Sequence, residues 1–137
     1  MLGSVVQDPR KFDEFGDINC EDEYARLDNF AVALQEMPNA RGIIVFYGGK
    51  VFRGKLPRRG DAVARAARMK PYLVERRGLS ASRVVVINGG YAENWRVDLW
   101  VLPQGSSTEY MAHPTIPANK IKFRKGTARA RDFRCEI

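Results

Sequence analysis

The sequence predicts a single domain of mixed class, an α/β (α+β) two-layer sandwich with the element order βαβαβ(β). Two observations carry this prediction. The apolar runs Gly42–Tyr47 and Arg83–Asn88 are rich in β-branched residues, as in strands that are covered on both faces or nearly so. Each run follows a segment, 27–34 or 62–73, in which apolar residues recur at helical spacing. Buried strands need helices on at least one side of their sheet, so this alternation predicts helices packed on a sheet.

The first half of the chain predicts a strand, a helix and then the first buried strand. Residues 11–15 are typical of a short strand, and Gly16 begins a break in the pattern. Asn19 or Asp17 can cap the following helix, whose first turn is acidic at 21–23. The helix has one apolar stripe, and Pro38 is expected to end it. The stripe consists of Leu27, Phe30, Ala31 and Leu34.

The second half predicts a basic helix and two more strands. The helix begins near Asp61 and ends at Gly78, and Pro71 is expected to bend it. An Asn-Gly-Gly turn at 88–90 is expected to separate the second buried strand from a last strand at 95–102. The face of the helix opposite its apolar stripe is expected to carry four arginines, Arg65, Arg68, Arg76 and Arg77.

Composition sets the broad class and the type of partner. The 137 residues are 45% hydrophobic and 28% charged, values typical of one globular domain. Lys and Arg number 23 against 16 acidic residues, which gives a net charge of +7. This excess favours anionic partners such as nucleic acid, acidic glycans or an anionic lipid surface, or it only keeps the protein soluble. No transmembrane segment is predicted, and no signal peptide is recognised in this chain. A secreted protein whose signal peptide has been removed would show the same pattern.

The two cysteines, Cys20 and Cys135, lie near opposite ends of the chain. We expect them to form a disulfide that ties the end of the chain to the start of the first helix, which implies an oxidising compartment. Two unrelated free thiols in a cytosolic protein are the alternative.

Composition changes after Pro103. We expect a lead-in at 1–10, a domain at 11–102, and a proline-containing linker with a basic C-terminal tail at 103–137. The tail could follow the phosphates of a nucleic acid, or its segment 120–125 could form an edge strand that charged side chains protect.

Six short motifs in 11–102 resemble, in order and spacing, the OmpA-like domain, the peptidoglycan-associated module of bacterial envelope proteins. They are Phe12-Asp13, Leu27 through Ala40, Arg65-Ala66 with Met69 and Tyr72-Leu73, Gly78-Leu79 with Arg83, Gly90 through Asn94, and Arg96 through Leu99.

This resemblance implies a βαβαβ-type fold. In such domains an Asp in a G-H-T-D turn and an Arg in an R-A pair hold the diaminopimelate of a cell-wall peptide. Arg65 matches that Arg, and its guanidinium could grip a carboxylate by two parallel hydrogen bonds. The Asp has no counterpart, because Phe46–Lys50 stands at the position of its turn.

The ligand-binding candidates lie in and after this turn and on the basic helix: Gly48, Gly49, Lys50, Arg58, Arg65 and Arg68. Gly48-Gly49 could cradle an anion with backbone N–H groups, or it could only let the strand end tightly. Arg65 could instead be an ordinary solvent-facing residue. Tyr91, Trp95 and Trp100 could form a stacking platform, or they could pack in the core and at a sheet edge.

No catalytic site, metal site or cofactor is predicted. His113 is the only histidine, and nothing in the sequence places it beside Cys20 as a base beside a nucleophile. The leading hypothesis is a periplasmic or secreted module of the bacterial envelope that binds a peptidoglycan fragment or an envelope protein. The alternative is an anionic-polymer or nucleic-acid binder that uses the basic helix and the tail.

Overall fold

The computed structural model describes residues 8–106 and 113–136. Residues 1–7, in the predicted lead-in, and 107–112, in the predicted linker, lie outside the described residues. The strands are β1 (Arg10–Phe15), β2 (Arg41–Val51), β3 (Arg58–Arg59), β4 (Val84–Asn94), β5 (Arg96–Leu102) and β6 (Arg124–Thr127). The helices are α1 (Cys20–Glu36), α2 (Asp61–Ala66), α3 (Met69–Pro71), the π-helix η1 (Tyr72–Arg76), and the 3-10 helices η2 (Ala81–Arg83), η4 (Ala118–Lys120) and η5 (Ala130–Phe133).

The fold is mixed α/β and is built on a four-stranded mixed sheet with the strand order β1-β5-β2-β4. The strands β2 and β4 are parallel, whereas β5 pairs antiparallel with both β1 and β2. The strands β3 and β6 form a separate two-stranded parallel sheet. The predicted class is therefore confirmed. The sequence allowed an edge strand at 120–125, and β6 forms at Arg124–Thr127, but its pairing with β3 in a second sheet was not predicted.

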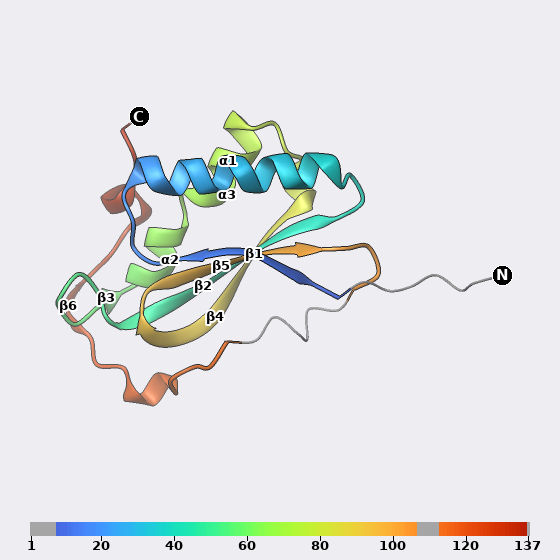
Figure 1. The fold of residues 1–137 in the computed structure, drawn as a ribbon. Coiled ribbons are helices and arrows are strands. Elements are labelled where there is room, and N and C mark those ends of the chain that lie inside the picture. The colour runs from blue at the N-terminus through green and yellow to red at the C-terminus, as the bar shows by residue number, and fades with distance from the viewer. Residues whose placement is uncertain (1–7, 107–112, 137) are drawn as a thin grey trace.

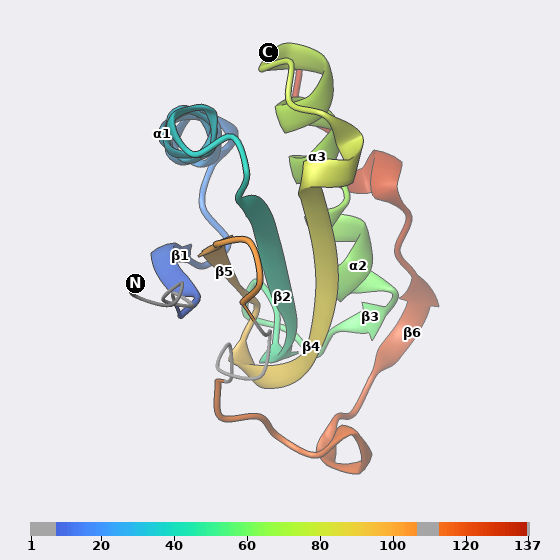
Figure 2. The ribbon, with the colours of Figure 1, turned by 90° about the vertical axis from the view of Figure 1, so that its right-hand side faces the viewer.

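The helices α1 and α2 lie on the same face of the large sheet (Figures 1 and 2). The main core lies between these layers, where Phe30 and Met69 from the helices pack with Ile44 and Leu99 from the strands. A second apolar cluster covers the other face of the sheet and includes Tyr47 and Trp100. Because β2 is covered on both faces, its run of eight buried residues needs no alternation with polar residues. Among the described residues, no helix has the length and apolarity needed to cross a membrane.

The helix α1 forms where the sequence predicts it. The side chain of Asn19 accepts a hydrogen bond from the Asp22 backbone N–H at 2.8 Å, so Asn19 is the cap. The far end is closed by Arg83, whose guanidinium donates to the backbone carbonyl oxygens of Leu34, Met37 and Ala40 at 2.7–3.1 Å. The Leu34 and Met37 carbonyl oxygens also accept backbone hydrogen bonds, from the Met37 and Ala40 N–H groups, so Arg83 adds a charged donor at this helix end.

The second helical segment differs from the prediction in two respects. It is interrupted between Ala66 and Met69, and Pro71 lies in the short helix that follows, where the chain continues into the π-helix η1. The expectation that its arginines face solvent is wrong for Arg65, which is 0% exposed, and for the largely buried Arg68. Helical spacing identifies an apolar stripe, but it does not reveal that distant carboxylates can pair with cations on the adjacent face.

The predicted turn at 88–90 is also wrong, because β4 runs through it to Asn94. The ladder between β2 and β4 shifts register between Phe46 and Gly48, and Gly90 has φ +105°. A bulge of this kind lets a strand bend without ending, and glycine accommodates the backbone. At Gly89 a Cβ would lie 2.4 Å from the Tyr47 ring, so the absence of a side chain allows that ring to pack there.

The C-terminal segment, predicted as a tail, is attached to the domain by several contacts, including the following three. The first is β6, which pairs with β3 through hydrogen bonds from the Arg124 N–H to the Pro57 carbonyl and from the Ala128 N–H to the Arg59 carbonyl, both 2.9 Å. The second is the side chain of Phe133, which is buried. The third is the predicted Cys20–Cys135 disulfide, which the structure contains.

Candidate functional site at the end of the parallel strands

The candidate site is a pocket of about 200 Å³ at the carboxyl ends of β2 and β4, which we call the strand-end pocket. In open α/β sheets, ligands bind outside the carboxyl ends of parallel strands, so this position is the expected one. The pocket is lined by Gly48, Gly49, Phe52, Pro57, Arg58, Gly60, Asp61, Ala62, Val63, Asn88, Tyr91, Trp95 and Phe123. Apolar and aromatic walls with a few polar groups are typical of ligand sites.

Three other hollows among the described residues are larger but more open to solvent, and one of them, of about 330 Å³, lies between Val32 and Arg77. One of about 580 Å³ lies between Glu14 and the segment 113–116, and one of about 350 Å³ lies beside Cys135. None of them lies at the ends of both parallel strands. The hollow beside Cys135 is lined by one predicted ligand-binding residue, Arg68, whereas the strand-end pocket is lined by three. The smaller, more enclosed pocket is therefore the better candidate.

Gly48 and Gly49 form the floor of the strand-end pocket because no side chain fits at either position. A Cβ at Gly48 would lie 2.7 Å from the Tyr91 ring and 3.0 Å from the Ala62 Cβ. A Cβ at Gly49 would lie 2.3 Å from the Val51 carbonyl oxygen. Both glycines are in register with β4, so the geometry favours close packing over an anion cradle.

The polar end of the strand-end pocket is formed by Arg58, Asp61 and Asn88. The Asp61 carboxylate is 2% exposed and accepts hydrogen bonds from the Arg58 backbone N–H at 2.5 Å and from the Arg58 Nε at 3.2 Å. The Arg58 guanidinium also lies 3.8 Å from the Asp132 carboxylate. Arg58 and Asp61 thus form a fixed pair of opposite charges at the pocket wall.

Aromatic side chains form the other walls. The Tyr91 and Phe123 rings meet edge to face, with centroids 6.3 Å apart. The Trp95 Nε1 donates a hydrogen bond to the Ala62 carbonyl oxygen at 3.1 Å, which fixes the indole beside the pocket. Aromatic rings that meet edge to face give the pocket a defined shape as well as an apolar surface.

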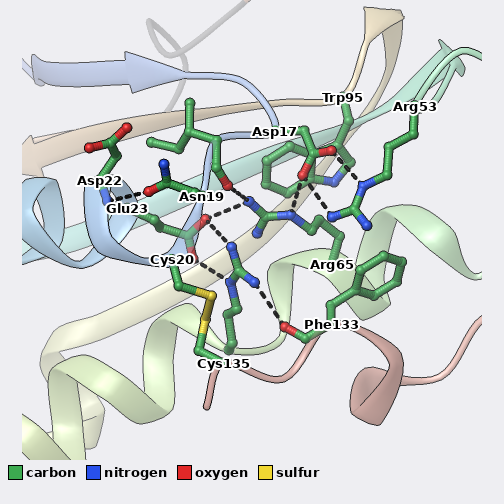
Figure 3. Close-up of polar contacts among 12 residues, drawn as sticks. Asp17, Asn19, Cys20, Asp22, Glu23, Arg53, Arg65, Trp95, Phe133 and Cys135 are labelled. Carbon is green, nitrogen blue, oxygen red and sulfur yellow. Dashed lines mark hydrogen bonds and ion pairs between the residues drawn. A yellow bond between two sulfur atoms is a disulfide. The ribbon is translucent and has the colours of Figure 1, made fainter. Parts of the chain in front are cut away.

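Behind Trp95 lies an ion cluster that consists of Asp17, Glu23, Arg53, Arg65 and Arg68 (Figure 3). We call it the buried ion cluster, because Glu23 and Arg65 at its centre are fully buried, although Arg53 at its edge is exposed. The Arg65 guanidinium contacts the Asp17 carboxylate at 2.7 Å and the Glu23 carboxylate at 2.8 Å. It also lies 4.4 Å from the centre of the Trp95 ring, within the range of a cation–π contact. The Arg65 guanidinium therefore does bind carboxylates, but they belong to Asp17 and Glu23 of the protein and not to a ligand.

Arg68 and Arg53 complete the buried ion cluster. Arg68 donates to both Glu23 oxygens at 2.7 and 3.2 Å and to the Phe133 carbonyl at 2.8 Å, so the cluster also holds the C-terminal segment. Arg53 donates to Asp17 at 2.7 and 3.1 Å. Burial alone would raise the pKa of Asp17, but the hydrogen bonds from Arg53 and Arg65 outweigh it and hold that pKa below its usual value.

The structure separates the six predicted ligand-binding residues into three groups. Gly48, Gly49 and Arg58 line the strand-end pocket. Lys50 is exposed and does not line it. Arg65 and Arg68 belong to the buried ion cluster, and Arg65 offers no surface to a ligand in this conformation.

Of the three aromatic residues proposed as a stacking platform, Tyr91 and Trp95 meet at the strand-end pocket, whereas Trp100 packs in the cluster on the other face of the sheet. Sequence reasoning did not place Asp61, Asn88 or Phe123 in the site. Phe123 reaches it only through the pairing of β3 with β6, which no local pattern reveals.

No catalytic arrangement is recognisable in the described part of the chain. Cys20 is in a disulfide, and the His113 ring packs against the Tyr47 ring at 5.3 Å. Within residues 8–106 and 113–136, no three His, Cys, Asp or Glu side chains gather in a group that could hold a metal ion.

No protein-family model matches the chain, and no curated protein matches it either.

Proposed function

We propose that this protein is a non-catalytic binding module of OmpA-like fold that works outside the cytoplasm, at the bacterial envelope, and binds a peptidoglycan fragment in the strand-end pocket. The order of its large elements agrees with this resemblance, since a strand, a helix, a strand, a broken helix and two strands follow one another. The disulfide supports an oxidising compartment. The observation that carries the proposal is the pocket itself, at the carboxyl ends of β2 and β4.

The proposed mode of binding differs from the one that the resemblance implies. Arg65 is occupied by Asp17 and Glu23, so it does not grip diaminopimelate. Arg58 and Asp61 instead place a cation and an anion at the wall of the strand-end pocket. Because the Asp61 carboxylate is buried and paired, the exposed part of Arg58 receives the carboxylate of a zwitterionic centre, and the aromatic walls cover the apolar part of the ligand.

The test is a titration of the protein with a soluble diaminopimelate-containing muropeptide. Val63 lines the strand-end pocket, yet its side chain is 55% exposed, so Val63→Trp fills the mouth without disturbing the core. Val32 on α1 is 51% exposed and does not line the pocket, so Val32→Trp is the matched control. We expect saturable binding to the native protein and to Val32→Trp, and loss of binding in Val63→Trp. Unchanged affinity in Val63→Trp, or no binding to the native protein, would contradict the proposal.

A further inference from the structure

Among the described residues, some cations form ion pairs with carboxylates, whereas several exposed cations gather without such a pair around β3 and β6. Six arginines and one lysine outside β3 and β6 form ion pairs with carboxylates: Lys11, Arg26, Arg53, Arg65, Arg68, Arg77 and Arg96. A second set surrounds β3 and β6, is exposed, and has no carboxylate within ion-pair distance among the described residues. This set, which we call the cationic ribbon, consists of Lys55, Arg59, Lys122, Arg124 and Lys125.

Both acids near the cationic ribbon are already paired. Asp61 lies 3.1 Å from the Arg58 guanidinium, and Asp132 lies 3.8 Å from it. The charges of the ribbon are therefore not neutralised locally. A local excess of one sign attracts a partner of the opposite sign and speeds its association.

The cationic ribbon is held in place by the fold. The strands β3 and β6 lie side by side at the outer edge of the molecule (Figure 2). The Arg124 Nε donates to the Leu56 carbonyl oxygen at 2.9 Å, and the Cys20–Cys135 disulfide fixes the end of the segment. The backbone that carries the cations is thus fixed, and the Arg59 and Arg124 side chains are held by contacts of their own, which reduces the entropy lost on binding.

We propose that the cationic ribbon binds an anionic polysaccharide outside the cytoplasm. The sign of the charge calls for a polyanion, and the disulfide favours an oxidising compartment outside the cytoplasm, where acidic glycans are abundant polyanions. The Arg59 guanidinium lies 4.5 Å from the Phe123 ring, so a flat apolar surface adjoins the charges. Phe123 also lines the strand-end pocket, so the two surfaces adjoin, but the five cations of the ribbon do not line that pocket and the inference does not depend on its ligand.

The expected salt dependence follows from the number of cations. If each contact releases about 0.7 counterion, as for single-stranded polyanions, five contacts give a slope of about −3.5 in log K against log salt. Affinity then falls on the order of 100-fold between about 50 and 200 mM salt. Loss of two cations lowers the slope to about −2.

The experiment measures the binding of an oligogalacturonate at several salt concentrations. The test variant is Lys122→Glu/Lys125→Glu. The matched control is Arg41→Glu/Lys70→Glu, which makes the same change in net charge at two residues outside the ribbon and outside all described ion pairs. We expect the test variant to lose at least about 10-fold in affinity at low salt and the control to change much less.

Three outcomes would overturn the inference. The first is no binding of oligogalacturonate at low salt. The second is an equal loss in the test and control variants, which would mean that only net charge matters. The third is binding of an oligothymidylate of equal charge as tightly as the oligogalacturonate, which would assign the surface to nucleic acid. Val63→Trp should keep its oligogalacturonate affinity while it loses the muropeptide, so failures of the two proposals can be told apart.

Discussion

Replacement of Arg65 by alanine tests whether this residue holds the fold together. Removal of one partner from a buried ion pair costs about 3–5 kcal/mol, because the remaining charge stays buried. In this protein Arg53 still pairs with Asp17 and Arg68 still pairs with Glu23, which moderates the loss. The contact with the Trp95 ring is lost as well, at about 0.5–2 kcal/mol. We therefore expect Arg65→Ala to lower the free energy of unfolding by about 3–4 kcal/mol.

The assay is urea unfolding of the oxidised protein followed by tryptophan fluorescence, with linear extrapolation to water. For a domain of this size the expected loss corresponds to a fall in Tm on the order of 10 °C. Arg41→Ala is the control, because Arg41 is exposed and belongs to no described ion pair. A loss below about 0.5 kcal/mol, typical of a surface substitution, would refute the reasoning and return Arg65 to a solvent-facing role.

Three further predictions concern stability. The intact oxidised protein should be lighter than the reduced protein by two hydrogen atoms, and reduction of the Cys20–Cys135 bridge should cost up to about 4–5 kcal/mol; equal masses would exclude the disulfide. Arg83→Ala should lower stability by about 2–3 kcal/mol in urea unfolding, because three carbonyl groups at the end of α1 lose their charged donor; a change near zero would count against this cap. The lowered pKa of Asp17 stabilises the fold above the ordinary value of 3.8, and this contribution is lost as the pH falls through the folded pKa. The stability difference between the native protein and Asp17→Asn should therefore narrow below pH 3.8, and a difference that stays constant would contradict this account.

The sequence predicts best those features that depend on local patterns. The cap at Asn19, the apolar stripe of α1 and the buried run in β2 are each confirmed, because each follows from a few neighbouring residues. The bridge between Cys20 and Cys135 is confirmed as well, since a chain with only two cysteines allows a single internal pairing.

Features that depend on distant contacts could not be predicted. Arg65 is buried because Glu23 and Asp17, acids 42 and 48 positions earlier in the chain, pair with it. The helical spacing of apolar residues gives no information about such distant partners. The Gly89-Gly90 pair has the composition of a turn, yet the strand continues because β4 bulges there, with one extra residue against β2, and Tyr47 occupies the space of the missing side chain. Phe123 enters the candidate site only through the long-range pairing of β3 with β6.

The most direct test of the proposed function is to map the muropeptide contact on the isotope-labelled protein by NMR chemical shifts. The account predicts that the largest shifts cluster at the strand-end pocket, at the backbone N–H groups of Gly48, Asn88 and Tyr91, and that they saturate with muropeptide concentration. Shifts that cluster instead at the larger hollow beside Glu14 and His113, or no saturable shifts at all, would contradict it.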